Sequence, residues 1–316
     1  MSVSTASSTA IGLALATIYL TWGSTYLAIR IAVETMPPFA MAAIRFIIAG
    51  TLLYVFLRCR GATKPTLRQW IDNSIIGTLL LLGGNALVGW AEQFIVSSVA
   101  ALLIGVGPLF IALTEWAWPG GERPTRLTIV ALLLGLFGVA WLAAPWESQS
   151  EGGLSQIGVI AILSACAFWS IGAIYSRHTK NGASPFMSAA LQMLGGCPAI
   201  IFVGLLCGDF QRFDASQVST SSCWAVIYLI FIGSLVGFSS FVWLMKNVSP
   251  ALASTHAFVN PLVAVVLGWW ILDEPLTART LTATAIIITA VAIISLQKKK
   301  HSDVVPPRQA VAAIKS

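Results

Sequence analysis

A histidine and an asparagine share one face of a helix in the apolar stretch from 251 to 271. His256 and Asn260 are four residues apart, a spacing that places two side chains one above the other, and Pro261 follows directly. Proline cannot donate to the preceding turn, so we expect a kink or a locally open backbone there. Because histidine changes charge near neutral pH, His256 is suited to bind a solute or to carry a proton. The alternative is a hydrogen-bonded histidine in a packed core.

Arg45 is the second candidate, because it is an arginine inside the apolar stretch from 38 to 57. A charge near the centre of a bilayer costs about 2.5–3.5 kcal/mol on insertion scales, so such residues usually have a purpose. As a structural residue, Arg45 would snorkel toward the membrane surface or pair with the C-terminal end of a helix. As a functional residue, it would contact an anionic group of a substrate.

Aromatic and neutral polar residues complete the set of candidates. Trp22 and Trp169 each lie about twelve residues into an apolar stretch, which places both near the middle of a membrane. Such a pair can stack on a flat or cationic ligand, or it can fill a junction between helices. Ser24 offers a hydroxyl beside Trp22, and Asn85 offers an uncharged amide in the stretch from 71 to 91. We predict that both line a cavity.

The remaining acidic groups do not indicate catalysis. Glu92 follows the stretch from 71 to 91, where a solvated helix end is expected rather than a proton-coupling carboxylate, and Glu115 is expected to meet Arg123 or Arg126. The sequence has no nucleotide-binding loop, no Ser/His/Asp set and no cysteine or histidine spacing typical of a metal site. We therefore predict no enzyme activity, no metal and no cofactor.

Ten apolar stretches must position these residues. Only 9% of the 316 residues are charged and 57% are hydrophobic, whereas soluble domains carry about a quarter charged residues. A soluble enzyme, a nucleic-acid binder and a secreted disulfide scaffold are thus excluded. Stretches of about 20 apolar residues match a bilayer core, and without period-2 alternation they predict helices. The expected spans of this all-α membrane protein are 10–29, 38–57, 71–91, 97–117, 127–144, 157–176, 185–207, 222–243, 251–271 and 279–296.

The basic residues predict the orientation of these spans. Ten spans divide the connections into two sets, one holding 14 lysines and arginines and the other three. Cytoplasmic loops carry the excess of positive charge, so both termini are expected in the cytoplasm. The first span lacks the basic leader of a signal peptide and is interpreted as a retained helix.

The chain repeats itself in two halves of five spans. At offsets of 147 and 153 residues, identical residues match in order: Trp22 with Trp169, Arg30 with Arg177, Pro38 with Pro185, Gly84 with Gly237, Trp90 with Trp243 and Pro108 with Pro261. Because five is odd, the second copy enters the membrane from the opposite side. Inverted repeats are typical of secondary transporters, since two halves that exchange conformations produce an outward-open and an inward-open state.

The expected organisation follows from these repeats. We assign 1–9 to a cytoplasmic N-terminus, 10–144 to the first repeat, 145–156 to a linker, 157–296 to the second repeat and 297–316 to a basic cytoplasmic tail.

Several short motifs resemble one family of membrane proteins. They are Trp22-Gly23-Ser24, Arg45-Phe46, Pro108 followed by Glu122, and Asn260-Pro261 followed by Glu274. In this order they resemble the drug/metabolite transporter superfamily, EamA type, and within it the bacterial YedA-like exporters. The resemblance covers about residues 10 to 296. It implies a ten-helix bundle whose central cavity is lined mainly by helices 1, 3, 4, 6, 8 and 9, and efflux of small metabolites or toxic compounds.

The leading hypothesis is therefore an exporter of small organic molecules in the bacterial inner membrane. Its partners would be a small-molecule substrate such as an amino acid or an aromatic or amphipathic compound, the lipid bilayer, and a coupled proton or exchanged solute. Nucleic acid is not expected, and a homodimer is possible. So little fixed charge within the spans favours zwitterionic, aromatic or amphipathic solutes over polyanions. The alternative is a non-transporting membrane scaffold or assembly partner.

Overall fold

All regular structure in the described residues is helical. The computed structural model describes residues 7–119, 125–143, 155–179, 181–248, 256–273 and 275–302. Seven helices in this part of the chain are long and apolar enough to cross a membrane, and they coincide with the predicted spans one to four and six to eight. Shorter apolar helices, Val259–Leu272 and Ala278–Ala290, lie where the ninth and tenth spans are predicted. The chain is thus an all-helical membrane protein.

The helices of the two halves follow one another in a similar order. The first half forms α1 (Ser8–Val33), α2 (Pro38–Cys59), α3 (Leu67–Gly77), η1 (Thr78–Ala86), α4 (Leu87–Ala91), α5 (Ser97–Ile104), α6 (Gly107–Ala117) and α7 (Arg126–Ala143). The second half forms α8 (Gln156–His178), α9 (Pro185–Leu206), α10 (Asp209–Arg212), η2 (Ala215–Gln217), α11 (Thr220–Tyr228), η3 (Leu229–Phe238), α12 (Ser239–Asn247), α14 (His256–Leu272) and α15 (Ala278–Ser302).

Local sequence signals set the starts of several helices. α2 and α9 both begin at a proline, Pro38 and Pro185, whose fixed φ suits the first turn and whose missing N–H costs nothing there. Ser184 caps α9 by accepting from the Met187 amide at 3.2 Å. Both helices are 22 residues long and pack along each other.

A π-helical stretch interrupts the third span of each half. η1 separates α3 from α4, and η3 separates α11 from α12. The two stretches occupy nearly the same place in the repeat, since an offset of 153 carries residues 78–86 onto 231–239. π-helical turns are rare and are frequently found at functional sites. The apolar pattern alone did not predict either one.

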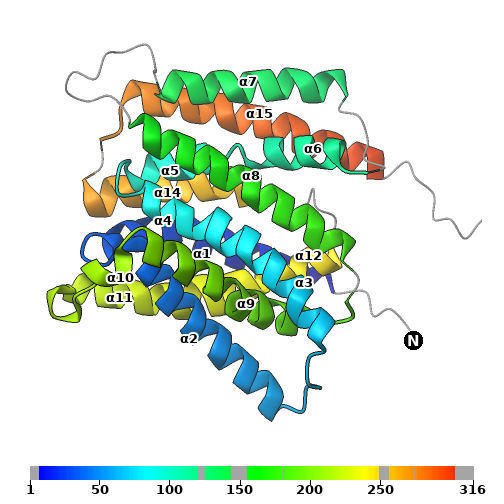
Figure 1. The fold of residues 1–316 in the computed structure, drawn as a ribbon. Coiled ribbons are helices and arrows are strands. Elements are labelled where there is room, and N and C mark those ends of the chain that lie inside the picture. Colours follow the sequence, from blue (N-terminus) through cyan, green and yellow to red (C-terminus); the bar gives the residue numbers. More distant parts are fainter. Residues whose placement is uncertain are drawn as a thin grey trace, which may run out of the picture.

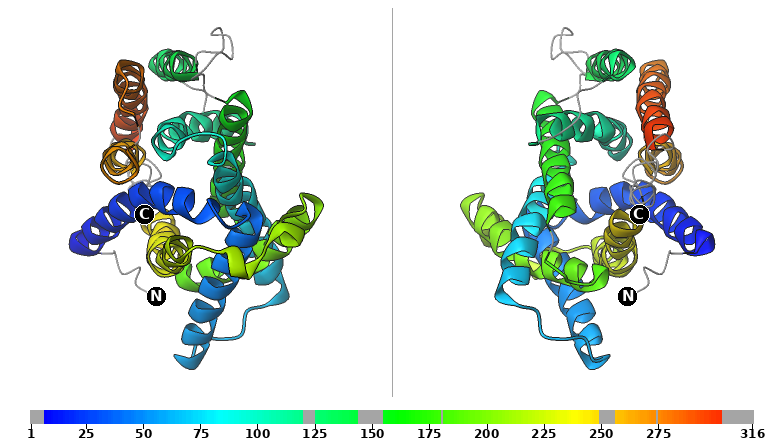
Figure 2. Two further views of the ribbon diagram at one scale, coloured as in Figure 1. Left: turned by 90° about the vertical axis from the view of Figure 1, so that its left-hand side faces the viewer. Right: turned by 90° about the vertical axis from the view of Figure 1, so that its right-hand side faces the viewer.

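The halves pack reciprocally. α1 of the first half packs against α11, η3, α12 and α14 of the second, and α8 of the second half packs against η1, α4, α5 and α6 of the first. α7 runs beside α15 at one edge of the bundle, and α2 lies at the opposite edge (Figures 1 and 2). Each half therefore completes the packing of the other.

The structure differs from the predicted spans in two places. α14 continues through Pro261 without an interruption, whereas the fourth span is interrupted at Gly105 and Val106, just before the equivalent Pro108. The last helix ends at Ser302 rather than at 296, so the lysines at 298–300 continue it. Glu122, Glu274, most of the predicted linker and the end of the tail lie outside the described residues.

Candidate functional site

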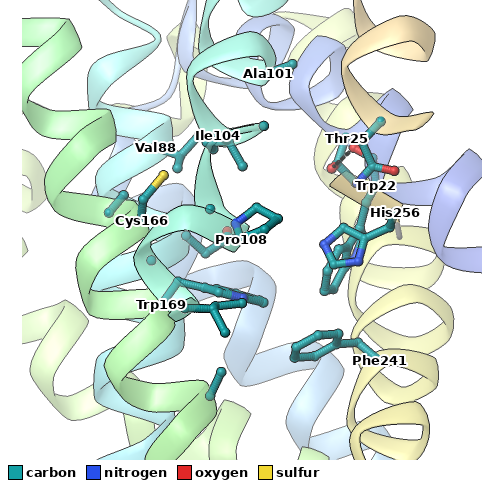
Figure 3. A pocket seen from close by; sticks show the side chains of 18 of the residues that line it. Trp22, Thr25, Val88, Ala101, Ile104, Pro108, Cys166, Trp169, Phe241 and His256 are labelled. Carbon is teal, nitrogen blue, oxygen red and sulfur yellow. Dashed lines mark hydrogen bonds between the residues drawn. The ribbon is translucent and has the colours of Figure 1, made fainter. Parts of the chain in front are cut away.

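A cavity lies between the two halves. It has a volume of about 110 Å³, far more than the ~10–15 Å³ that one water needs. Trp22, His256 and Phe241 reach it from one wall, and Trp169 and Pro108 reach it from the wall opposite (Figure 3). The elements that supply its lining are α1, α2, η1, α4, α5, α6, α8, α12 and α14. Six of the seven predicted site residues line it: Trp22, Arg45, Asn85, Trp169, His256 and Asn260.

Four aromatic rings form a cluster in this cavity. Trp22 and Trp169 meet edge to face, with ring centroids 5.5 Å apart. His256 also meets Trp22 edge to face at 5.2 Å. Phe241 joins both tryptophans, at 4.9 Å from Trp22 and 5.2 Å from Trp169. Edge-to-face and tilted pairs at these distances attract one another, so the cluster is a defined aromatic surface.

Each tryptophan packs on a glycine of the other half. A Cβ on Gly84 would lie 2.7 Å from the Trp169 ring, and a Cβ on Gly237 would lie 2.9 Å from the Trp22 ring. Gly84 and Gly237 are equivalent residues in the repeat, as are Trp22 and Trp169. The absence of a side chain at both glycines lets each indole lie directly against the facing helix.

Arg45 is buried in the bundle. Its side chain is only 2% exposed, so of the alternatives for Arg45 the structure contradicts snorkelling toward the membrane surface. Nε donates to Ser234 Oγ at 2.8 Å, and Nη1 donates to Asn85 Oδ1 at 3.1 Å. The guanidinium carbon also lies 4.7 Å from the centre of the Phe46 ring. Arg45 thereby joins η1 of the first half to η3 of the second.

Asn260 ties α14 to α1. It is 3% exposed, and with its amide turned so that the nitrogen donates, that nitrogen lies 3.2 Å from the carbonyl oxygens of His256 and Tyr19. Asn260 therefore holds the first turn of α14, and with it the His256 ring, against the first span.

Ser24 is not among the residues that line the cavity. Its hydroxyl lies 2.6 Å from the Tyr228 hydroxyl and also donates to the Leu20 carbonyl oxygen at 2.8 Å. Ser24 thus connects α1 to α11, next to Trp22 in the sequence but behind the cavity wall.

The two ends of the cavity differ. At the end near Ile29, the lining residues Tyr26, Ile29 and Val88 are all buried. At the other end, Arg177 is exposed and Met245 is half-buried. Among the described residues, the cavity is therefore closed at the Ile29 end and accessible at the Arg177 end.

Equivalent arginines occupy these two ends, each with an acidic residue. At the closed end, Arg30 donates to the backbone carbonyl oxygen of Glu92, whose side chain is fully buried. The prediction of a solvated Glu92 is therefore wrong. At the accessible end, Arg177 Nη1 lies 3.2 Å from Glu115 Oε1, with side chains 43% and 31% exposed.

The sequence did not single out all of the lining. Phe241 has no distinctive neighbours, although its equivalent Val88 also lines the cavity. The break at Gly105 and Val106 exposes Gly107 and Pro108 to the same space, and its signal in the sequence is the closely spaced glycines. In the described part of the chain, no group of three His, Cys, Asp or Glu residues is arranged to hold a metal ion.

Comparison with known proteins decides the family. The model of a family described as the EamA-like transporter family matches residues 9–144 and 156–296. The chain belongs to the EamA-like transporter family. It is accordingly a membrane transporter, and the EamA resemblance noted in its motifs is confirmed.

Relatives of this EamA chain span nearly its full length. The uncharacterized inner membrane transporter YedA of Escherichia coli K12 is 36% identical over 288 residues, which is 90% of each chain. The uncharacterized transporter YvbV of Bacillus subtilis is 25% identical over 291 residues, covering 91% of this chain and 92% of YvbV. One solved structure superposes on 92% of this chain and 99% of its own, with a TM-score of 0.65 and 21% identity, a likeness that shows the fold alone.

Proposed function

We propose that this chain is a secondary transporter of the bacterial inner membrane that exports small organic molecules by alternating access. The single observation that carries the proposal is the cavity between the halves, which is lined by residues of both. Its described lining is buried near Ile29 and exposed at Arg177. The inner-membrane assignment rests on the likeness to YedA, whose name places it there.

The architecture in this proposal is ten transmembrane helices arranged as two inverted repeats, 10–144 and 157–296. The reciprocal packing of α1 and α8 supports it, as do the equivalent π-helical stretches. The exchange of contacts between two equivalent tryptophans and two equivalent glycines is what a two-fold axis between the halves would produce. The family match in two successive segments is consistent with it.

Alternating access explains why one end of the cavity is closed and the other is accessible. In a pair of equivalent halves, one state is closed at one end and open at the other, and exchange of the two conformations reverses this. The buried Ile29 end and the exposed Arg177 end correspond to one such state. With both termini in the cytoplasm, as the basic residues predict, the Arg177 end faces inward, the side from which an exporter loads.

The aromatic cluster and the polar residues would bind different parts of the solute. Trp22, Trp169 and His256 offer faces and edges to an apolar or aromatic part of the solute. Asn85 and Arg45 offer hydrogen bonds from the adjoining wall. Asn260 positions His256, and Ser24 acts behind the wall through Tyr228. Coupling to a proton or to an exchanged solute supplies the energy.

Purified protein in liposomes provides the test. Liposomes loaded with an unlabelled solute should take up the same solute in labelled form, with saturable rates, for some members of a panel of amino acids, nucleosides, aromatic carboxylates and cationic drugs. No saturable counterflow across the panel would contradict the proposal. A non-transporting scaffold would instead show a loss of abundance in Trp22 variants with no change in the resistance of cells that produce them.

A further inference from the structure

Arg45 carries a buried positive charge that no described acidic side chain balances. It lies 2% exposed in the bundle, and both of its hydrogen-bond partners, Ser234 and Asn85, are neutral. We propose, on the basis of the transport function above, that the cavity binds its substrate as an organic monocarboxylate whose carboxylate pairs with the Arg45 guanidinium.

The charged residues that line the cavity favour the binding of an anionic ligand. Its lining contains two arginines, Arg45 and Arg177, and no aspartate or glutamate among the described residues. Arg177 is already paired with Glu115 at 3.2 Å. The ion pairs found in the described chain do not include Arg45. Since a buried charge is stabilised by an opposite one, the missing counter-charge is one that a ligand can bring.

The guanidinium has donors to spare. Arginine carries five N–H donors, and the described contacts of Arg45 use Nε–H and one N–H of Nη1. The Nη2 group lies beside Gly233, where a Cβ would be only 3.1 Å away. A carboxylate accepts two parallel N–H bonds from a guanidinium, which makes the pair directional as well as charged.

The surroundings predict the rest of the ligand. Asn85 follows Gly84, which packs against Trp169, so the arginine and the aromatic cluster occupy adjoining walls of one cavity. A solute with a carboxylate at one end and an apolar or aromatic group at the other would reach both. Because Arg45 can balance only one negative charge, dicarboxylates and phosphate esters, which carry two, should bind poorly.

A head-group series on the full-length protein tests this assignment. 3-Phenylpropionate, 3-phenylpropionamide and 3-phenylpropylamine share a ring and a chain length but carry negative, neutral and positive head groups. Binding is measured as ligand-induced thermal stabilisation in lipid nanodiscs, and transport as counterflow in liposomes. The wild-type protein should bind the anion at least about tenfold more tightly than the amide or the amine.

Arg45 variants locate the effect. In Arg45→Gln the affinity for 3-phenylpropionate should fall about tenfold or more, while that for the amide changes less than about twofold; Arg45→Lys should retain part of the preference. The matched control is Arg60→Gln, an exposed arginine just beyond the end of the same helix. If Arg45→Gln does not fold, the head-group series on the wild-type protein still shows whether the cavity prefers the carboxylate.

The outcomes separate this inference from the transport function itself. Equal binding of the three probes, tighter binding of the amine, or no binding of the anion overturns the carboxylate site. If the amide or the amine still shows saturable counterflow, the transport function stands and only the carboxylate site is overturned. Counterflow of no solute in this series or in the wider panel would overturn the transport function.

Discussion

Arg45 Nη1 lies 3.1 Å from Asn85 Oδ1, so a cation of the second span is hydrogen-bonded to the π-helical stretch of the third. The pair lies in the wall of the cavity. Asn85 is consequently the position at which a counter-charge can be built into the protein itself.

In Asn85→Asp, the new side-chain carboxylate is expected to take the place of the ligand carboxylate beside Arg45. The new carboxylate would pair with Arg45, because buried opposite charges at this distance attract strongly. We expect a higher thermal midpoint of unfolding and a loss of 3-phenylpropionate affinity of at least about tenfold, equivalent to ~1.4 kcal/mol. Asn247→Asp, an exposed position on α12, is the control. Unchanged binding of the anion by Asn85→Asp would contradict the role of Arg45.

Gly84→Ala and Gly237→Ala should both impair transport, and to a similar degree. An added methyl would displace Trp169 in the first variant and Trp22 in the second, since the Cβ would lie 2.7 Å and 2.9 Å from their rings. Overpacking of this kind costs about 1–3 kcal/mol, which predicts a lowered thermal midpoint and a disturbed aromatic cluster. Gly12→Ala on α1, where a Cβ meets nothing within 4 Å, should behave as wild type. Transport that is normal in both variants would show that the tryptophan positions do not matter.

Cysteine labelling should report the unlike ends of the cavity. In a chain whose five cysteines are replaced by alanine, Met245→Cys should react with a soluble maleimide at least about tenfold faster than Ile29→Cys. The reason is that Met245 is half-buried at the accessible end and Ile29 is 2% exposed at the closed end. A transported solute should speed the labelling of Ile29→Cys. Rates that are equal, or that no solute changes, would contradict alternating access.

His256→Gln should fold and should flatten the pH dependence of transport if the imidazole carries the coupled proton. Glutamine keeps a polar side chain next to Trp22 but does not change charge near neutral pH. The measurement is the initial counterflow rate from pH 5.5 to 8. His178→Gln is the matched control, because that ring stacks on Trp118 and does not line the cavity. An unchanged profile in His256→Gln would leave His256 as a binding or packing residue.

Composition predicted the all-helical membrane fold, and the sequence singled out six of the residues that line the cavity, Trp22 and Trp169 among them. These features depend on apolar periodicity and on matched positions, which a sequence displays directly. The sequence did not predict which residues contact the charged side chains. Glu92 is buried although it ends a span, and Arg45 is held by Ser234, a residue 189 positions away. Such contacts depend on how the halves pack, and the pairing cannot be read from either half alone.

The two π-helical stretches and the break before Pro108 escaped prediction for a related reason. All three keep the hydrophobicity of the spans that contain them, so the apolar pattern is the same with or without them. Ser24 was placed in the cavity because it is near Trp22 in the sequence, but a helix turns its neighbours in different directions. Its side chain points to Tyr228 instead.

The most direct test of the central claim is whether a side chain that fills the cavity stops transport. Ile104 lines the cavity just before the break in the fourth span, whereas Leu113 in the same span is 40% exposed and does not line it. Counterflow into liposomes that contain equal amounts of protein should be lost in Ile104→Trp and retained in Leu113→Trp. Wild-type counterflow in a stably inserted Ile104→Trp protein would show that solutes do not cross through this cavity.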